Sequence, residues 1–151
     1  MNYREIETLL KKLPHRIQIE FALYCAKDVF HLIPEKDKAY AQNCIETIEG
    51  FLKGEKSEED CWNLTNTTEH APGYQIDNTV YTTFTIEAAI DTVIADADNT
   101  ADPAISSYAY ATKAAYYATK AKNVDAKEYY DVLLTWVNEL GTIEKLIYGI
   151  E

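Results

Sequence analysis

Residues 15–33 read HRIQIEFALYCAKDVFHLI, and the apolar side chains in this stretch recur at the three- and four-residue steps of an α-helix. The apolar arc is wide and takes in Ile17, Ile19, Phe21, Ala22, Tyr24, Cys25, Ala26, Val29, Phe30 and Leu32. A surface helix needs only a narrower stripe, so this arc predicts a central helix that several neighbours contact. Pro34 ends the helix, because the residue before a proline disfavours helical geometry.

The rest of the chain has the same period, and few glycines or prolines interrupt it. It predicts helices at residues 2–12, 36–53, 77–96 and 103–122, a short one that begins at Ser57, and a last one capped by Asp125. Asp102 is the expected cap of the helix at 103–122. Residues 80–86 read VYTTFTI and would also suit a strand, but the spacing on either side favours a helix. The sequence therefore predicts one all-α domain over residues 1–151, a compact bundle of six to seven helices.

Nearly all of the net charge of −11 belongs to residues 55–102, which we name the acidic segment. It contains one base, Lys56, and eleven acids, so its net charge is 1 − 11 = −10. Its acids are Glu55, Glu58, Glu59, Asp60, Glu69, Asp77, Glu87, Asp91, Asp96, Asp98 and Asp102. A field of one sign repels nucleic acids and anionic membranes and attracts a basic partner.

Part of this negative charge can stabilise the N-terminus of the fourth helix. The hydroxyl of Ser57 can accept a hydrogen bond from the amide of Glu59 or Asp60. Glu58, Glu59 and Asp60 also lie over the positive end of the helix dipole, where carboxylates are stabilising.

Several features favour a cytoplasmic protein. No apolar run approaches the roughly 18 residues of a membrane span. Glu5 and Glu7 interrupt any signal-peptide pattern near the N-terminus. The three cysteines lack a CxxC spacing, and buried, reduced thiols are the expected state.

A metal site is the first chemical alternative. Glu87 and Asp91 lie one helical turn apart and could share a cation with Asp96 or Glu69. The histidines show no ExxH, HExxH or HxxxH spacing, so the sequence favours a solvated acidic helix face and no bound metal.

A catalytic site has little support. A cysteine–histidine pair would have to form across helices, for example between Cys44 or Cys61 and His15 or His70, and the acids around Cys61 would raise its pKa. The chain has no GxSxG, P-loop or GxGxxG motif, so we expect no enzymatic activity and no cofactor. Lys11, Lys12, His15 and Arg16 form too small a basic patch for a nucleic-acid site.

Tyrosines are concentrated near the end of the chain: Tyr108, Tyr110, Tyr116, Tyr117, Tyr129 and Tyr130. Helical spacing cannot bury both members of an adjacent pair, so some of these rings either fill the edges of the core or face a partner. Alanines at 104, 111, 115 and 118 mark a narrow stripe that could pack in the core or support a homodimer.

The order of several small and apolar residues resembles a family of small all-helical immunity proteins of bacteria and their phages. The resemblance rests on ALYCAKDV at 22–29, Ile45-Glu46, FLKG at 51–54, and the alanine pairs at 88–89 and 114–115. It covers about residues 20–122. Phe21 stands where that family commonly has Trp, and residues 38–40 read KAY where it commonly has an Arg-Pro-Arg-like segment. The resemblance implies a non-enzymatic binder that neutralises a toxin.

These observations predict a non-enzymatic acidic binding protein of the immunity or inhibitor type, which neutralises a basic-faced toxin, nuclease or defence protein. The predicted partner-binding residues are Glu58, Glu59, Asp60, Glu87, Asp91, Asp96, Asp98, Tyr110 and Tyr117. The alternative is a phage counter-defence protein that sequesters a small molecule or nucleotide between helices. Its phosphate ligands would come from Arg16, Lys113, Lys120 and Lys122.

Overall fold

The computed structural model describes residues 2–65, 78–95 and 106–148. These residues form seven α-helices and one 3-10 turn, with no β-strand among them: α1 (Tyr3–Lys11), α2 (His15–Val29), η1 (Phe30–Leu32), α3 (Glu35–Leu52), α4 (Glu58–Thr65), α5 (Asn78–Ile94), α6 (Ser107–Lys122) and α7 (Lys127–Tyr148). The predicted all-α bundle is confirmed. None of these helices is long and apolar enough to cross a bilayer.

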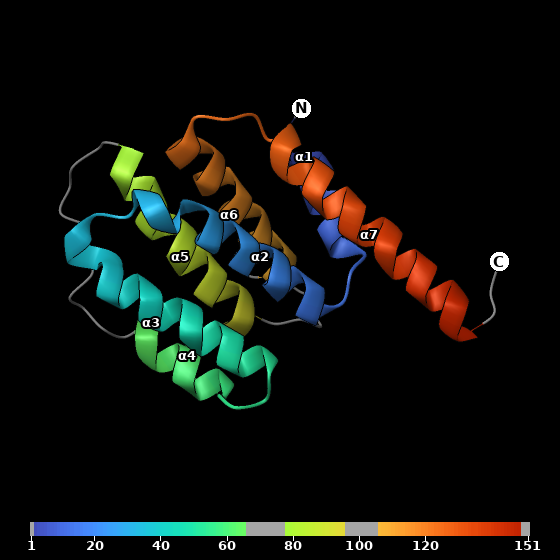
Figure 1. Cartoon of the computed structure of the whole chain (residues 1–151), viewed down its shortest axis with the longest axis horizontal. Coiled ribbons are helices and arrows are strands. Elements are labelled where there is room, and N and C mark those ends of the chain that lie inside the picture. Colours follow the sequence, from blue (N-terminus) through green and yellow to red (C-terminus); the bar gives the residue numbers. More distant parts are fainter. Residues whose placement is uncertain (1, 66–77, 96–105, 149–151) are drawn as a thin grey trace.

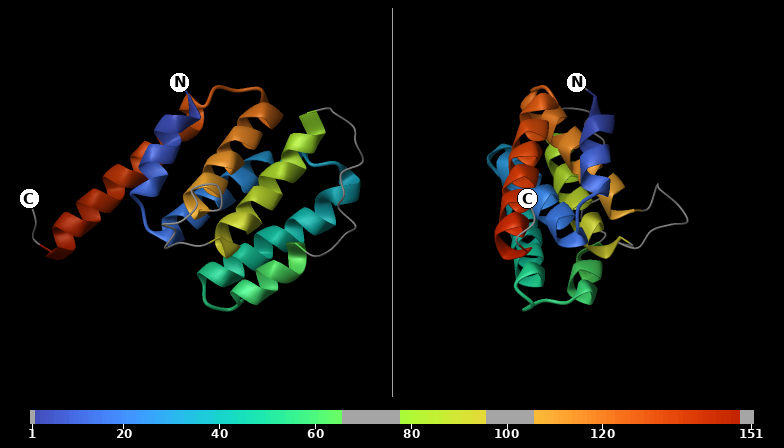
Figure 2. Two further views of the ribbon diagram at one scale, coloured as in Figure 1. Left: turned by 180° about the vertical axis from the view of Figure 1, so that it is seen from behind. Right: turned by 90° about the vertical axis from the view of Figure 1, so that its right-hand side faces the viewer.

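The helices lie in two layers (Figure 1). One layer contains α7, α2 and α3, and the other contains α1, α6, α5 and α4, as the side view in Figure 2 shows. Neighbours in the second layer pack side by side, and the contact between α5 and α6 is the most extensive among the described helices. α2 lies across both of these helices. It is therefore the central helix that its wide apolar arc predicted.

Small side chains are buried on both α5 and α6, which contact each other extensively. Ala89 on α5 and Ala111, Ala115 and Ala118 on α6 are fully buried. Small residues let two helix axes approach closely. Because these alanines are buried within one chain, a homodimer would have to form through another surface.

Buried polar side chains tie the two layers together. The amide of Gln18 on α2 donates to the carbonyl oxygens of Leu10 and Leu13, and its Oε1 accepts a hydrogen bond from Ser107 on α6. His15 Nε2 lies 2.8 Å from the carbonyl oxygen of Thr92 on α5. Buried polar groups of this kind are satisfied by hydrogen bonds, so they specify how the helices meet.

Two helix boundaries differ from the prediction. The α-helix predicted over 15–33 ends at Val29 and tightens into η1, because Pro34 cannot donate the next backbone hydrogen bond. The helix predicted from residue 103 begins at Ser107, since Ser106 is extended (φ −79°, ψ 152°) and serves as its N-cap residue. The predicted cap Asp102 lies outside the described residues.

Candidate functional site: an acidic surface on α4 and α5

The start of α4 combines capping with exposed charge. The amide and hydroxyl of Ser57 donate to Asp60 Oδ2 at 2.7 and 3.1 Å, and Ser57 Oγ accepts from the amide of Asp60 at 3.2 Å. The prediction that Ser57 caps this helix is confirmed. The hydrogen bonds from the backbone and side chain of Ser57 lower the pKa of Asp60. Glu58 and Glu59 are exposed. Asp60 therefore stabilises the N-terminus of α4, whereas the side chains of Glu58 and Glu59 are exposed to solvent.

Glu87 and Asp91 on α5 are in a different environment, because both are half-buried. In the part of the chain that the structure describes, neither carboxylate has a hydrogen bond or an ion pair. Burial, followed by the charge of Asp91, raises the pKa of Glu87 to about 7. Burial also raises the pKa of Asp91 to about 6, and Lys113 opposes that rise. The helix face at these two residues is therefore less solvated than the sequence led us to expect, since packing in the bundle removes part of their water.

An aromatic cluster borders the Glu87–Asp91 pair. The ring of Tyr117 on α6 stacks on Tyr81 at 6.3 Å between centroids and lies 5.2 Å from Phe84, and both of these rings belong to α5. Burial, then Tyr116 and Glu87, raise the pKa of Tyr117. The structure thus brings Tyr117 and the two carboxylates together.

Tyr110 has a separate setting. Its ring lies under the ammonium of Lys113, 5.0 Å from centroid to Nζ. Lys113 is also the base that acts on Asp91. Tyr110 is therefore connected to the acidic pair through a lysine and does not belong to the Tyr117 cluster.

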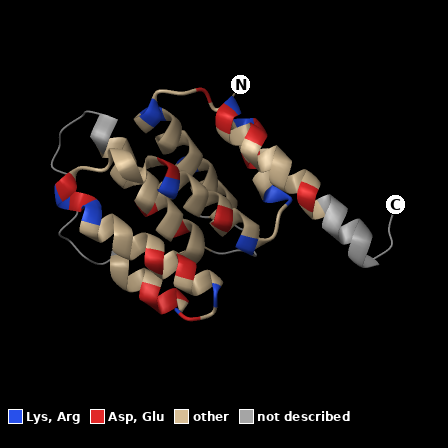
Figure 3. Cartoon of the chain, in the orientation of Figure 1, with Lys and Arg blue, Asp and Glu red and all other residues tan. Residues whose placement is uncertain are grey.

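The described acids of the acidic segment lack basic partners. They are Glu55, Glu58, Glu59, Asp60, Glu87 and Asp91. Six ion pairs occur within the described ranges, and every one of them uses an acid from outside the acidic segment: Glu20, Asp28, Glu35, Glu49, Glu128 and Asp131. Figure 3 shows acids gathered on α4 and the turn before it, at the lower edge of the view. The acids of α4 and α5 consequently form no ion pair with the bases of this part of the chain, and the charge of Lys113 acts on Asp91 without pairing with it.

α4 and α5 are neighbours, and buried cysteines lie between them and α3. The pKa of Cys44 on α3 is raised to about 12 by burial, with further contributions from Glu87 on α5 and Cys61 on α4. The acids of α4 and the pair on α5 thus occupy adjacent helices. Asp96 and Asp98, also predicted for this surface, lie outside the described residues.

The cysteines are buried in the described structure, and their thiols have raised pKa values. All three thiols are buried and free, as expected. Burial raises the pKa of Cys25 well above its ordinary value and that of Cys61 to about 11, with Asp60 and Glu58 adding to the latter. His15 bonds to a backbone carbonyl, and His70 is outside the described residues. No three His, Cys, Asp or Glu side chains of the described ranges gather closely enough to hold a metal ion.

Two features were not visible in the sequence pattern. The first is a polar cluster in which Asp28 Oδ2 accepts from Lys122 Nζ and from Tyr129 Oη, both at 2.7 Å. Although burial opposes ionisation, these two hydrogen bonds hold the pKa of Asp28 below its ordinary value. Lys122 also pairs with Glu128 at 3.2 Å, so the cluster joins α2, α6 and α7.

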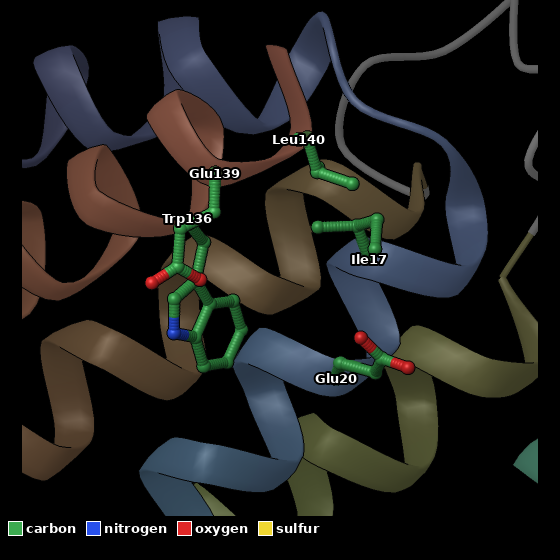
Figure 4. A pocket seen from close by; sticks show the side chains of 5 residues that line it. All are labelled: Ile17, Glu20, Trp136, Glu139 and Leu140. Atoms are coloured by element: carbon green, nitrogen blue, oxygen red, sulfur yellow. The ribbon is translucent and has the colours of Figure 1, made fainter. Parts of the chain in front are cut away.

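The second feature is an open groove between α2 and α7 with a volume of about 220 Å³. It is lined by Ile17, Glu20, Trp136, Glu139 and Leu140 (Figure 4). Because its walls come from helices more than a hundred residues apart in the chain, no local spacing could have indicated it.

Comparison of the chain with known protein families, with curated proteins and with solved structures finds no match.

Proposed function

We propose that this chain is a non-enzymatic binding protein of the immunity or inhibitor type, whose α4–α5 surface docks on a basic-faced toxin, nuclease or defence protein. The observation that carries the proposal is the unpaired charge of this surface: the described acids of the acidic segment make no ion pair within the described ranges. A surface with an excess of one charge repels nucleic acids and anionic lipids, and it attracts a protein of opposite charge.

Aromatic side chains near the acids suit this role. Trp62 lies on α4 beside the exposed glutamates and is 48% exposed, and Tyr116 on α6 is 37% exposed. Trp and Tyr dominate binding energy at protein interfaces because they bring a large, rigid contact area. Charge on such a surface speeds association more than it deepens affinity.

The small-molecule alternative has less support. A nucleotide would need several free cations together, but Lys122 is held by Asp28 and Glu128, and Arg16 bonds to the carbonyl oxygen of Leu52 and to Glu20. The groove between α2 and α7 has carboxylates in its walls, which disfavour a phosphate.

The test compares two double variants that each remove two negative charges. Glu58→Gln with Glu59→Gln alters α4, and Glu5→Gln with Glu7→Gln alters exposed acids on α1. Association rates with a panel of purified basic nuclease toxins would be measured by surface plasmon resonance over a salt series. We expect the α4 variant to slow association about threefold to tenfold at low salt, the α1 variant to have a smaller effect, and both effects to vanish near about 1 M salt.

Two results would contradict the proposal. Association that does not depend on salt would remove the electrostatic role of the surface. Equal slowing by the two variants would show that only total charge matters and that α4 is not the docking site.

A further inference from the structure

The groove between α2 and α7 has a rigid aromatic wall. The indole of Trp136 meets Phe21 and Tyr24 edge to face, at centroid distances of 6.1 and 5.8 Å, and these contacts fix its orientation. Ile17 and Leu140 face each other at one end of the groove, with Glu139 above the indole and Glu20 on the α2 side (Figure 4). Beyond this point α7 extends past the rest of the bundle (Figure 1).

Two carboxylates give the groove its charge. Glu139 is exposed and has no ion pair among the described residues. Glu20 Oε1 lies 3.3 Å from Arg16 Nε, one helical turn apart, in a pair whose arginine is exposed and whose glutamate is half-buried. Such surface pairs contribute little, about 0–1 kcal/mol, so a better-placed cation can replace Arg16. The rim is thus negative, with one carboxylate unpaired and the other weakly held.

Size and chemistry limit what can bind. Drug-sized ligands usually occupy pockets of about 300–1,000 Å³, so a groove of about 220 Å³ suits one long side chain better than a nucleotide. An aromatic face beside carboxylates favours a cation. A guanidinium fits better than an ammonium, because it is planar, stacks on an indole, is weakly hydrated and donates to two carboxylates at once.

We propose that this groove binds a single arginine side chain presented by a protein partner. The guanidinium stacks on Trp136 and donates to Glu139 and Glu20, and the methylenes of the arginine pack on Ile17 and Leu140. The groove belongs to α2 and α7, so this proposal does not rest on docking at α4 and α5.

The first experiment titrates small probes and follows the indole resonance of Trp136 by NMR. The variant Trp62→Phe removes the only other tryptophan and leaves one indole signal. The probes are N-acetyl-arginine amide, its neutral isostere N-acetyl-citrulline amide, and a capped Leu-Arg-Leu tripeptide. We expect a saturable shift with the arginine probes and none with citrulline, and about threefold tighter binding of the tripeptide because its leucines bury further apolar surface beside the groove.

Variants with opposite expected signs separate a binding role from a structural one. Glu139→Gln should weaken binding of the arginine amide about tenfold, because it removes a charge-assisted hydrogen bond. Arg16→Met should tighten binding about twofold to threefold, because it removes the cation that competes for Glu20. The control Glu5→Gln, an exposed acid on α1, should leave binding unchanged, and circular dichroism should show all variants folded.

Three outcomes would overturn the proposal. The absence of a saturable shift with the arginine amide would show that the groove does not bind arginine. An equal shift with citrulline would show that the probe binds through apolar contacts and that its charge plays no part. Tighter binding of N-acetyl-arginine amide than of the capped tripeptide would replace the protein partner with a small guanidinium compound.

Discussion

Replacement of Glu87 with glutamine is expected to stabilise the fold at alkaline pH and to leave it unchanged in acid. Burial, followed by Asp91, raises the pKa of Glu87 from 4.5 to about 7. Between these two values the folded chain holds a proton that the unfolded chain has lost. Stability therefore falls as pH rises through this window, and the full penalty is present above about pH 7. Glutamine keeps the size of the side chain and has no charge to bury.

The size of this effect follows from the gap between the two pKa values. A difference from 4.5 to about 7 would correspond to roughly 3 kcal/mol for a carboxyl fully removed from water. Glu87 is only half-buried, and solvent screening reduces the expected gain in the free energy of unfolding to about 1–2 kcal/mol.

The assay is urea unfolding of the native chain and of Glu87→Gln at about pH 4, 6 and 8, followed by circular dichroism. The two stabilities should coincide near pH 4 and diverge as pH rises, with the variant more stable. Glu7→Gln, at an exposed position on α1, is the matched control and should stay within about 0.5 kcal/mol of the native chain at every pH. A gain of equal size at all pH values, or a loss near pH 8, would refute the reasoning.

Further predictions concern the buried polar groups and the docking surface. Asp28→Ala should lower the free energy of unfolding by about 2 kcal/mol, because it leaves the buried hydroxyl of Tyr129 without its hydrogen-bond acceptor. The control Asp131→Ala, in the exposed pair with Lys127, should lower it by under about 0.5 kcal/mol, and denaturant titrations measure both changes. The three thiols should resist iodoacetamide in the native state and react after unfolding, since all are buried and have raised pKa values; mass spectrometry counts the adducts. A partner that places a cation beside Glu87 should release protons on binding near pH 7, which calorimetry in buffers of different ionisation enthalpy detects.

Helix positions could be predicted from periodicity alone, because each helix displays its apolar stripe in its own sequence. The prediction of 36–53 corresponds to Glu35–Leu52, and that of 2–12 to Tyr3–Lys11. The β-branched run at 80–86 shows why spacing outweighs propensity. It lies within α5, where Thr85 Oγ1 donates to the carbonyl oxygen of Tyr81, one turn earlier, and its hydroxyl needs no partner outside the helix.

The environment of the carboxylates could not be predicted in this way. The spacing of Glu87 and Asp91 shows that they share one face of the helix. It does not show how far the helices next to α5 bury that face. Asp28 meets Lys122, 94 residues away, and Trp136 meets Phe21 only because α7 returns to α2. The burial and the pKa of a side chain depend on such contacts between helices. The residue pattern within a single helix contains no information about these contacts.

The two kinds of acid on the proposed docking surface have different physical roles. Glu58 and Glu59 are exposed, so their charge acts at long range on the rate of encounter. Glu87 and Asp91 are ionised at a cost to stability, since water reaches them only in part and no base of the described chain pairs with them. A partner that supplies a cation there relieves a penalty already present in the free protein. Binding at the half-buried pair therefore gains the free energy of the new contact and also the relief of this penalty. Binding at the exposed acids of α4 gains no such relief, so we expect the acids of α5 to contribute most of the affinity.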